Sequence, residues 1–427
     1  MNQELLYEFI PILDKKKWTK KELAAKSGVN YSDIIRIFNN KKMLSFHCLE
    51  AITQAIGLPV GAFYYKYTQL CFNQNGYLDK RRSMAYIYKC ALYGFHKELN
   101  YMLNLILEES SKTIRTKNYL ILFQVAEKLF LEGNEKEALP LYKLFIELMP
   151  DNTSEEIAIS YFRKFYIIRL TEEGQATIVY LLEYISYMPM EFQELTYLWI
   201  TATFYTLKQW DKVFHYAKRL EKIAQIEDHY GRALMYQCFA LTRLGGSLDE
   251  VMAIIDQYEI INEYYSDIAI GNRFVALIDF GELNYVDEYR NWLRNRTDQF
   301  VGIPRILEAY VKLGRLEDAT DIIYHHENEM IKLKLSSTLN QQNLYLDYCY
   351  AFSLYKCERK EYTAGLNELI DVAERAKNIG IFEKFKQCLI AIWKYRNYMT
   401  PELEQRYIKL LSLNENQQNQ LNYLGAY

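Results

Sequence analysis

From residue 83 onward, apolar residues recur at spacings of three and four positions over long windows, with only brief interruptions. This spacing places the apolar side chains on one side of an α-helix. The 427-residue chain contains only 17 Gly and 7 Pro, which are fewer turn-forming residues than an all-β fold of this length needs. The pattern therefore predicts an all-α protein built from long amphipathic helices.

The interruptions recur at intervals of 33 to 45 residues. Each predicted unit has a helix, a short turn that usually contains glycine, and a second helix that opens with Glu or Asp. The turns lie around Gly133, Gly174, Gln209, Gly245, Gly281, Gly314 and Arg359. These intervals bracket the period of about 34 residues that is typical of tetratricopeptide helix pairs. A single unit cannot bury its apolar side, so we expect a right-handed superhelix, with an irregular all-α domain as the alternative.

The segment Trp18–Lys42 has a different pattern, that of two short helices joined by a tight turn. Thr19 is a candidate N-cap of the first helix, and Asn30 is a candidate N-cap of a second helix over residues 31–38. Gly28 lies in the turn, where a positive φ is often required. Helix-turn-helix domains place their second helix in the major groove of DNA, so the segment predicts a DNA-binding domain. Such domains also serve as protein-interaction modules, which is the alternative.

The exposed side of the predicted second helix supplies the candidate base contacts. Arg36 can donate two hydrogen bonds to guanine, and Tyr31 and Ser32 can reach bases or phosphates. Asp33 cannot face a phosphate, so it accepts from a cytosine amino group, orients Arg36, or lies off the DNA. The remaining candidate DNA-binding residues flank the two helices, mostly as phosphate contacts that position the domain. They are Thr19, Lys20, Asn30, Asn39, Lys41 and Lys42.

The charge of the chain is distributed unevenly. Residues 1–82 contain 13 Lys and Arg against 7 Asp and Glu, whereas the remainder contains 38 against 47. A basic amino-terminal part joined to an acidic body is typical of a DNA-reading domain attached to a sensor. Chance clustering of the charges is the alternative.

Polar residues inside the apolar helices of the array are candidate ligand contacts on its concave surface. Amide side chains can hydrogen-bond the backbone of an extended peptide, and arginine can hold a terminal carboxylate. Each residue is also compatible with a solvated or interhelical position. The candidate peptide-binding residues are Arg232, Gln237, Asn272, Arg273, Arg305, Gln341, Gln342 and Asn343.

Sequence signatures of enzymes, metal sites and membrane segments are absent. The histidines show no metal-binding spacing, and His325 and His326 point about 100° apart on a predicted helix. No nucleotide-binding or nucleophile-elbow motif occurs. The seven cysteines lack CxxC spacing, and neither a signal peptide nor a run of about 18 apolar residues is found. We therefore expect a cytoplasmic protein that is not an enzyme and has no cofactor, metal or membrane partner.

The order of these elements resembles the peptide-pheromone receptors of Gram-positive bacteria, the Rap/Rgg/NprR/PlcR/PrgX group. Within that group the chain is most similar to the arbitrium receptors (AimR-like proteins) of Bacillus phages. The resemblance spans nearly the whole chain and includes the texture of residues 64–107, which contain YYKYTQLCFNQN and KRRSMAYIYKC.

The resemblance implies a homodimeric transcriptional regulator that binds a palindromic double-stranded DNA operator and controls the choice between lysis and lysogeny. It implies that a short signalling peptide binds in the superhelical groove, with Arg232 near its carboxylate and Gln342 near its amino-terminal part. Two departures stand out. The helix before Gln209 lacks the asparagines expected near the carboxylate, and Arg305 stands where an acidic residue is expected. The alternative is a Rap-like, peptide-regulated adaptor that acts through protein partners rather than DNA.

These observations predict four segments. They are a helix-turn-helix DNA-binding domain over 1–60, a linker helix over 61–82, a tetratricopeptide-like peptide-sensing superhelix over 83–400, and a capping or dimerisation helix with a polar tail over 401–427.

Overall fold

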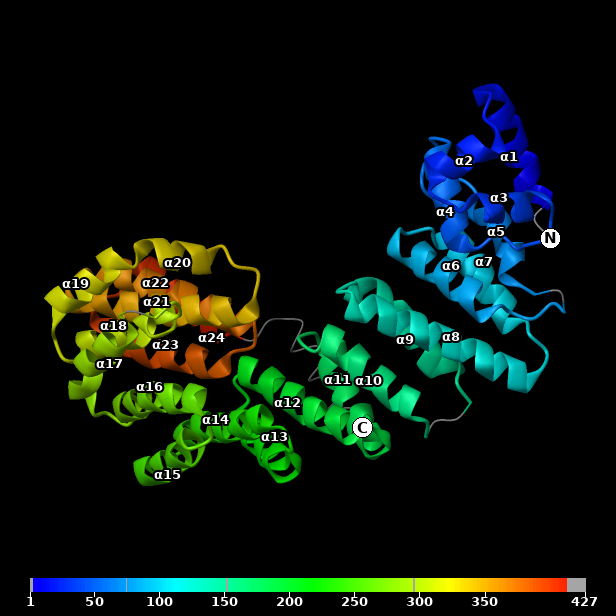
Figure 1. Cartoon of the computed structure of the whole chain (residues 1–427). Coiled ribbons are helices and arrows are strands. Elements are labelled where there is room, and N and C mark those ends of the chain that lie inside the picture. Colours follow the sequence, from blue (N-terminus) through cyan, green and yellow to red (C-terminus); the bar gives the residue numbers. More distant parts are fainter. Residues whose placement is uncertain (1–2, 74, 151–152, 295, 413–427) are drawn as a thin grey trace, which may run out of the picture. The chain divides into compact units, whose positions relative to one another are not determined.

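The computed structural model describes residues 3–73, 75–150, 153–294 and 296–412. Its described residues form α-helices and short 3₁₀ segments, with one isolated β-bridge between Phe72 and Leu78 and no strand (Figure 1). The prediction of an all-α fold is confirmed. None of the described helices is both long and apolar enough to cross a membrane.

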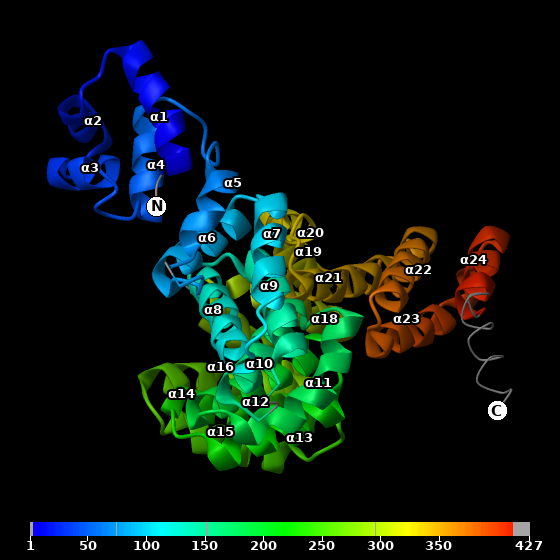
Figure 2. The same ribbon diagram turned by 90° about the vertical axis from the view of Figure 1, so that its right-hand side faces the viewer.

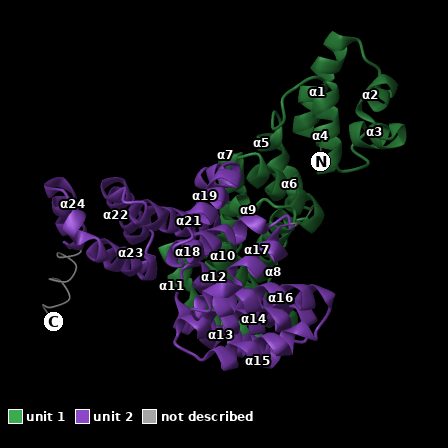
Figure 3. Cartoon of the chain, turned by 90° about the vertical axis from the view of Figure 1, so that its left-hand side faces the viewer, with its two compact units in different colours: residues 1–193 green, residues 194–427 purple. Residues whose placement is uncertain are grey.

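By its internal packing the chain divides into two compact units, residues 1–193 and 194–427 (Figure 3). The division falls inside one helix, α12, which runs from Met190 to Thr206. The finer subdivision predicted from sequence, with boundaries at residues 60, 82 and 400, and the handedness of the superhelix stay predictions.

The first unit contains eleven α-helices before α12 among its described residues. They are α1 (Gln3–Lys16), α2 (Lys20–Ser27), α3 (Tyr31–Phe38), α4 (Phe46–Ala55), α5 (Tyr64–Tyr67), α6 (Lys80–Leu92), α7 (His96–Leu107), α8 (Lys112–Leu131), α9 (Glu135–Leu148), α10 (Glu155–Ile168) and α11 (Glu172–Tyr184). The first four helices group together (Figure 2), and α2 packs against both α3 and α4. From α6 to α11, each helix packs against the next along the chain.

The two short helices predicted near the amino terminus are present with their predicted caps. Thr19 Oγ1 accepts a hydrogen bond from the Glu22 N–H at 3.2 Å, and the Glu22 carboxylate accepts from the Thr19 N–H at 2.7 Å. Asn30 Oδ1 accepts from the Ser32 N–H at 2.8 Å. Gly28 has φ 70°, the left-handed conformation that ends α2 at little cost only with glycine. Capping therefore fixes both ends of α2 and the amino end of α3.

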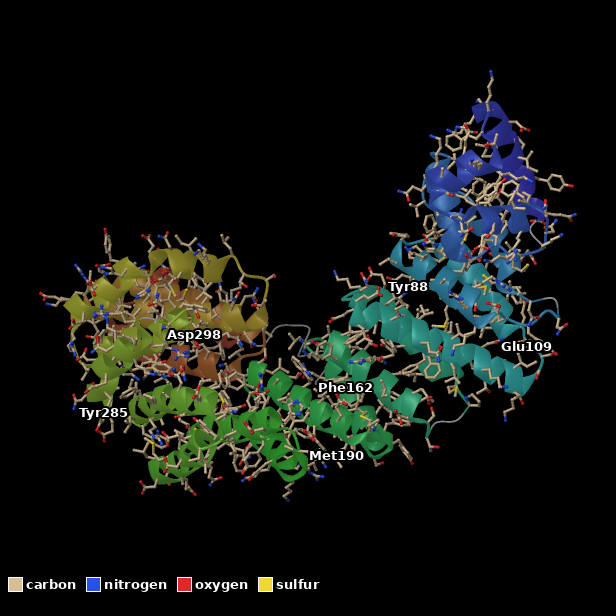
Figure 4. All side chains as sticks on the ribbon, in the orientation of Figure 1. Tyr88, Glu109, Phe162, Met190, Tyr285 and Asp298 are labelled. Atoms are coloured by element: carbon tan, nitrogen blue, oxygen red, sulfur yellow. The ribbon has the colours of Figure 1, made fainter. Side chains whose placement is uncertain are left out.

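The core of the first unit is rich in aromatic residues. Phe46 on α4 packs against Tyr64, Tyr67 and Tyr86, with ring centroids 5.0, 5.1 and 5.8 Å away. These rings join α4 to α5 and α6. Farther along, side chains fill the space between neighbouring helices, as at Phe162 on α10 (Figure 4), which is buried.

The second unit continues from α12 with twelve further α-helices among its described residues. They are α13 (Trp210–Ile223), α14 (Glu227–Arg243), α15 (Leu248–Glu259), α16 (Glu263–Asp279), α17 (Val286–Leu293), α18 (Ile303–Lys312), α19 (Leu316–His325), α20 (Glu327–Lys334), α21 (Leu339–Glu358), α22 (Tyr362–Asn378), α23 (Phe382–Lys394) and α24 (Pro401–Leu411). Consecutive helices pack together from α13 through α23, and α18 also packs directly against α21.

Most of the predicted turns lie where the sequence placed them. Gly133, Gly245, Gly281 and Gly314 follow the ends of α8, α14, α16 and α18, and each has a positive φ. The prediction for Gly174 is wrong, because this residue lies in the first turn of α11 rather than in the loop. Thr171 caps α11 by accepting from the Gly174 N–H at 3.1 Å, and a Cβ at position 174 would collide with the backbone of Ile168.

Candidate functional site

Helix α3 has one buried and one exposed side. Ile34 and Ile37 are fully buried against the neighbouring helices. Tyr31, Ser32 and Arg36 are exposed, and Tyr31 keeps half of its surface accessible. Among the described residues, the Arg36 guanidinium makes no ion pair. Three of the four candidate base contacts therefore lie on the accessible side of a capped helix, the position that a base-reading helix requires, and the fourth, Asp33, is partly buried.

Two of the predicted DNA-binding residues pair with each other. Lys42 Nζ lies 2.7 Å from the Asp33 carboxylate. Asp33 is thus paired with Lys42 rather than with Arg36, and the positive charge of Lys42 is partly neutralised by the Asp33 carboxylate. Lys20 stands apart from this pair, with its ammonium 5.3 Å from the centroid of the Phe38 ring.

The other predicted phosphate contacts differ in how far their side chains are engaged. The side chains of Thr19 and Asn30 serve as caps of α2 and α3. Asn39 and Lys41 are exposed at the carboxyl end of α3. Asn39 and Lys41 are therefore the more accessible candidates.

A cavity of about 440 Å³ lies inside the second unit. This volume falls within the range of roughly 300–1,000 Å³ that is usual for ligand sites. Its walls come from the end of α12, the start of α13, and from α14, α16, α17, α18 and α21, together with the segment before α18. The polar and charged lining residues are Lys208, Thr242, Arg243, Asn272, Asp279, Arg305, Asn340, Gln341, Asn343 and Asp347.

Four of the eight predicted peptide-binding residues line this cavity. They are Asn272, Arg305, Gln341 and Asn343. They come from three helices, α16, α18 and α21, and the fold brings them to a single space. Their roles toward a ligand stay predictions.

Two other predicted residues lie away from the cavity and are engaged locally. The Arg232 guanidinium forms an ion pair with Asp228 one turn earlier on α14, at 2.8 Å, and remains half exposed. The Gln342 side-chain amide donates to the Ser336 carbonyl at 3.1 Å. Neither side chain lines the described cavity.

The last two predicted residues join neighbouring helices. Gln237 is fully buried and donates from Nε2 to the Glu221 carboxylate on α13 at 2.8 Å. Arg273 donates to Glu259 and Asp256 on α15, each at 2.6 Å. Each side chain joins the first helix of one pair to the second helix of the preceding pair, so both are interhelical residues.

An ion-pair network that the sequence did not reveal crosses the cavity wall. Asp279 on α16 accepts from Arg305 on α18 at 2.9 and 3.2 Å and from Arg243 on α14 at 3.1 Å. Burial alone would raise the pKa of Asp279, but the two guanidinium groups outweigh burial and hold the pKa below its usual value. Asp279 therefore stays ionised and ties three successive wall helices together.

A second ion pair lies beside the first. Lys384 on α23 and Asp347 on α21 are 2.8 Å apart. Burial acts to raise the pKa of Asp347, whereas the ammonium groups of Lys384 and Lys208 lower it, and the lowering prevails. The wall of the larger cavity thus carries Lys208, Arg243 and Arg305 against two carboxylates, Asp279 and Asp347.

Aromatic rings form the apolar part of the wall. Tyr205 and Phe239 face each other with ring centroids 5.7 Å apart. Lys208 lies over Tyr205 and Trp210, 5.3 and 5.4 Å from the ring centroids. Tyr289 on α17 and Phe300 in the segment before α18 also line the cavity. The cavity therefore offers both apolar surface and charged hydrogen-bonding groups.

Two cavity-lining residues that the sequence analysis did not select, Arg243 and Asp279, lie on the same side of their helices as residues that it did select. Arg243 lies eleven positions after Arg232, three turns along the same side of α14. Asp279 lies seven positions after Asn272 on α16 by the same rule. The predicted side of α14 was therefore appropriate, but the cavity lies at the opposite end of that helix.

Among the residues that the structure describes, no group of three or more His, Cys, Asp and Glu side chains has a geometry that would hold a metal ion. Six of the seven cysteines are buried and Cys48 is partly buried; the buried ones are Cys71, Cys90, Cys238, Cys349, Cys357 and Cys388. Burial raises the pKa of the Cys238 thiol beside the cavity to about 12, so it remains protonated.

No protein-family model matches the chain, and no curated protein matches it in sequence. A solved structure described as "Crystal Structure of Rap Protein Complexed with Competence and Sporulation Factor" aligns with 91% of this chain and 100% of its own. The sequence identity is 14% and the TM-score is 0.30. A likeness at this level assigns no function to the chain.

Proposed function

We propose that this chain is a peptide-responsive, DNA-binding transcriptional regulator of the arbitrium-receptor type. The observation that carries the proposal is the cavity of the second unit, where amide side chains, arginines and aromatic rings from separate helices face one space. Asn272 and Asn343 offer the neutral hydrogen-bonding groups that a peptide backbone requires. The aromatic wall offers apolar surface for peptide side chains.

The first unit supplies the output of the proposed regulator. The accessible side of α3 carries Tyr31, Ser32 and Arg36 at a capped helix, and Lys41 follows its carboxyl end. Arginine reads guanine through two hydrogen bonds, and lysine contacts phosphates without reading sequence. The excess of basic residues over residues 1–82 favours association with DNA.

The proposed mechanism is a shift between dimer geometries. Two copies of α3 bind the half-sites of a palindrome only when they are correctly spaced. A peptide changes DNA affinity only if it binds one geometry of the homodimer more tightly than another. In the phage setting that the sequence resemblance implies, this shift selects between lysis and lysogeny.

Two measurements on the full-length chain test the proposal. Calorimetry against synthetic peptides from short reading frames beside the gene measures peptide binding, and selection from a random-sequence DNA library measures operator binding. Recovery of a palindrome whose affinity changes with a bound peptide supports the proposal. Peptide binding without any selected DNA would instead favour the peptide-regulated adaptor, and binding of neither ligand overturns both.

A further inference from the structure

A short segment between α12 and α13 is hydrogen-bonded to helices α21 and α23, near the other end of the second unit's sequence. We name residues 206–210 the latch segment. Its Thr206 carbonyl accepts from Asn343 Nδ2 on α21 at 2.9 Å, and its Trp210 Nε1 donates to Glu383 on α23 at 2.7 Å. The bonded residues are 137 and 173 positions apart in sequence. These two bonds therefore join the first helices of the unit to its later helices.

The latch segment lies directly on the ligand cavity. Lys208, Trp210 and Asn343 line both the large cavity and a smaller one of about 60 Å³. Glu383 lines the smaller cavity. Opening of the two latch bonds would therefore change the wall of the space in which a ligand would bind.

The two polar atoms of the Asn343 side chain differ, because Nδ2 takes part in a latch bond whereas Oδ1 has no hydrogen-bond partner among the described residues. Its donation to the Thr206 carbonyl fixes which end of the amide is nitrogen. The side chain is only 5% exposed, and its Oδ1 is buried and accepts no hydrogen bond from any residue that the structure describes. A buried acceptor without a donor is unfavourable, so a ligand donor that reaches this oxygen through a small movement of the Asn343 side chain would be stabilised there.

The charges of the wall indicate which class of donor fits. Lys208, Arg243 and Arg305 outnumber the two carboxylates of the large cavity. An ammonium or guanidinium donor would be repelled by the excess of cations. A neutral amide N–H, as in a peptide backbone, meets no such repulsion.

We propose that Asn343 couples ligand binding to closure of the latch segment. A backbone N–H of a bound peptide donates to Asn343 Oδ1 and thereby holds the amide in the orientation that keeps Nδ2 on the Thr206 carbonyl. Ligand binding and latch closure then stabilise each other by the same factor, because coupling between two equilibria is reciprocal. This inference rests on the proposed peptide-binding function and specifies how the cavity responds to its ligand.

Calorimetry first identifies a peptide that binds the full-length chain from a pool of random-sequence synthetic peptides. Hydrogen exchange with and without that peptide then measures the coupling. The bound peptide should slow amide exchange over residues 204–212 by roughly five- to 150-fold, the usual range of coupling between sites. Asn343→Ala should lose this protection and bind the peptide more weakly. Gln257→Ala on α15 is the control, because this side chain is exposed and does not line the cavity, and the variant should behave as the parent chain.

Trp210→Phe provides a second variant that does not alter Asn343. It removes the donor to Glu383 and one ring of the indole, and it should speed exchange of the latch segment in the peptide-free chain. Peptides methylated at one backbone nitrogen at a time identify the donor, since one position should lose affinity in the parent chain and lose none further in Asn343→Ala. Loss of binding only when the peptide's amino groups are acetylated would show a cationic donor and overturn the assignment.

The outcomes separate this inference from the proposed function. Peptide binding without slower exchange of the latch segment, or equal protection in Asn343→Ala and the parent chain, overturns the coupling and leaves peptide sensing intact. Failure of every peptide to bind overturns both.

Discussion

Lys42 Nζ lies 2.7 Å from the Asp33 carboxylate, across the end of α3. Sequence alone left three roles open for Asp33, one of which was to orient Arg36. The ion pair with Lys42 disfavours that role and places a negative charge next to a residue predicted to contact phosphate. A carboxylate so placed weakens the attraction of Lys42 for DNA.

Asp33→Asn is therefore expected to strengthen DNA binding. Without the carboxylate, Lys42 would neutralise phosphate more fully, and the slope of log affinity against log salt should steepen by up to about 0.9. Titrations of the selected operator at several salt concentrations measure both quantities. Weaker binding, confined to one base pair of the operator, would mean instead that Asp33 reads a cytosine.

Arg36→Ala and Lys41→Ala should affect DNA binding in different ways. Arg36 lies on the exposed side of α3, so its loss should relax preference at one base pair and cost about 1–3 kcal/mol of discrimination. Loss of Lys41 should weaken binding to all sequences and lower the salt slope by about one. Competition between operator and mutated operators separates the two effects, and an Arg36→Ala variant with unchanged base preference would contradict this assignment.

The helices near the amino terminus were predictable because their signals are local. Thr19, Gly28 and Asn30 act within three or four residues of themselves, so their spacing in sequence is also their spacing in the fold. The same reasoning gave a wrong result at Gly174. A glycine is required there because the Ile168 backbone lies too close for a Cβ, and the sequence cannot distinguish such a close approach from a turn, since both select glycine.

The cavity was only partly predictable because its walls come from distant helices. On α21, Gln341 and Asn343 line the cavity whereas Gln342 turns to Ser336, since successive helical residues point about 100° apart. A run of polar residues does not reveal which of its members faces inward. The pairing of Asp279 with Arg243 and Arg305 depends on three helices and leaves no local pattern in the sequence.

Asp279→Asn should destabilise the second unit by roughly 1–3 kcal/mol, because it removes the charged acceptor that Arg243 and the partly shielded Arg305 share. Urea unfolding at neutral pH, followed by circular dichroism, measures the loss. Asp256→Asn is the control. Asp256 is two-thirds exposed and Arg273 keeps Glu259, so that variant should change stability by less than about 1 kcal/mol. Equal losses in the two variants would contradict a special role for Asp279.

The same network predicts how stability depends on pH. The pKa values of Asp279 and Asp347 in the folded chain lie below their ordinary value. Groups with lowered pKa values stabilise the fold above the unfolded value, near pH 4, and this contribution is lost as pH falls through the folded value. The free energy of unfolding should therefore fall steadily below about pH 4 in the parent chain. The free energy of unfolding should fall less steeply with decreasing pH in Asp279→Asn than in the parent chain. Parallel curves for the two chains would show that ionisation of Asp279 does not contribute to this pH dependence.

Gly174→Ala should destabilise the first unit, although alanine normally stabilises a helix by about 1 kcal/mol relative to glycine. The added Cβ would meet the Ile168 carbonyl and the Arg169 backbone, and neither can move without shifting the loop that leads to Thr171, the N-cap of α11. We expect a net loss of about 1–3 kcal/mol, as for other overpacked sites. Gln175→Ala, one position along α11, lacks this collision and should stay within about 0.5 kcal/mol of the parent chain. Thermal and urea unfolding of the three chains give the comparison, and a stabilised Gly174→Ala variant would show that the loop before α11 moves freely.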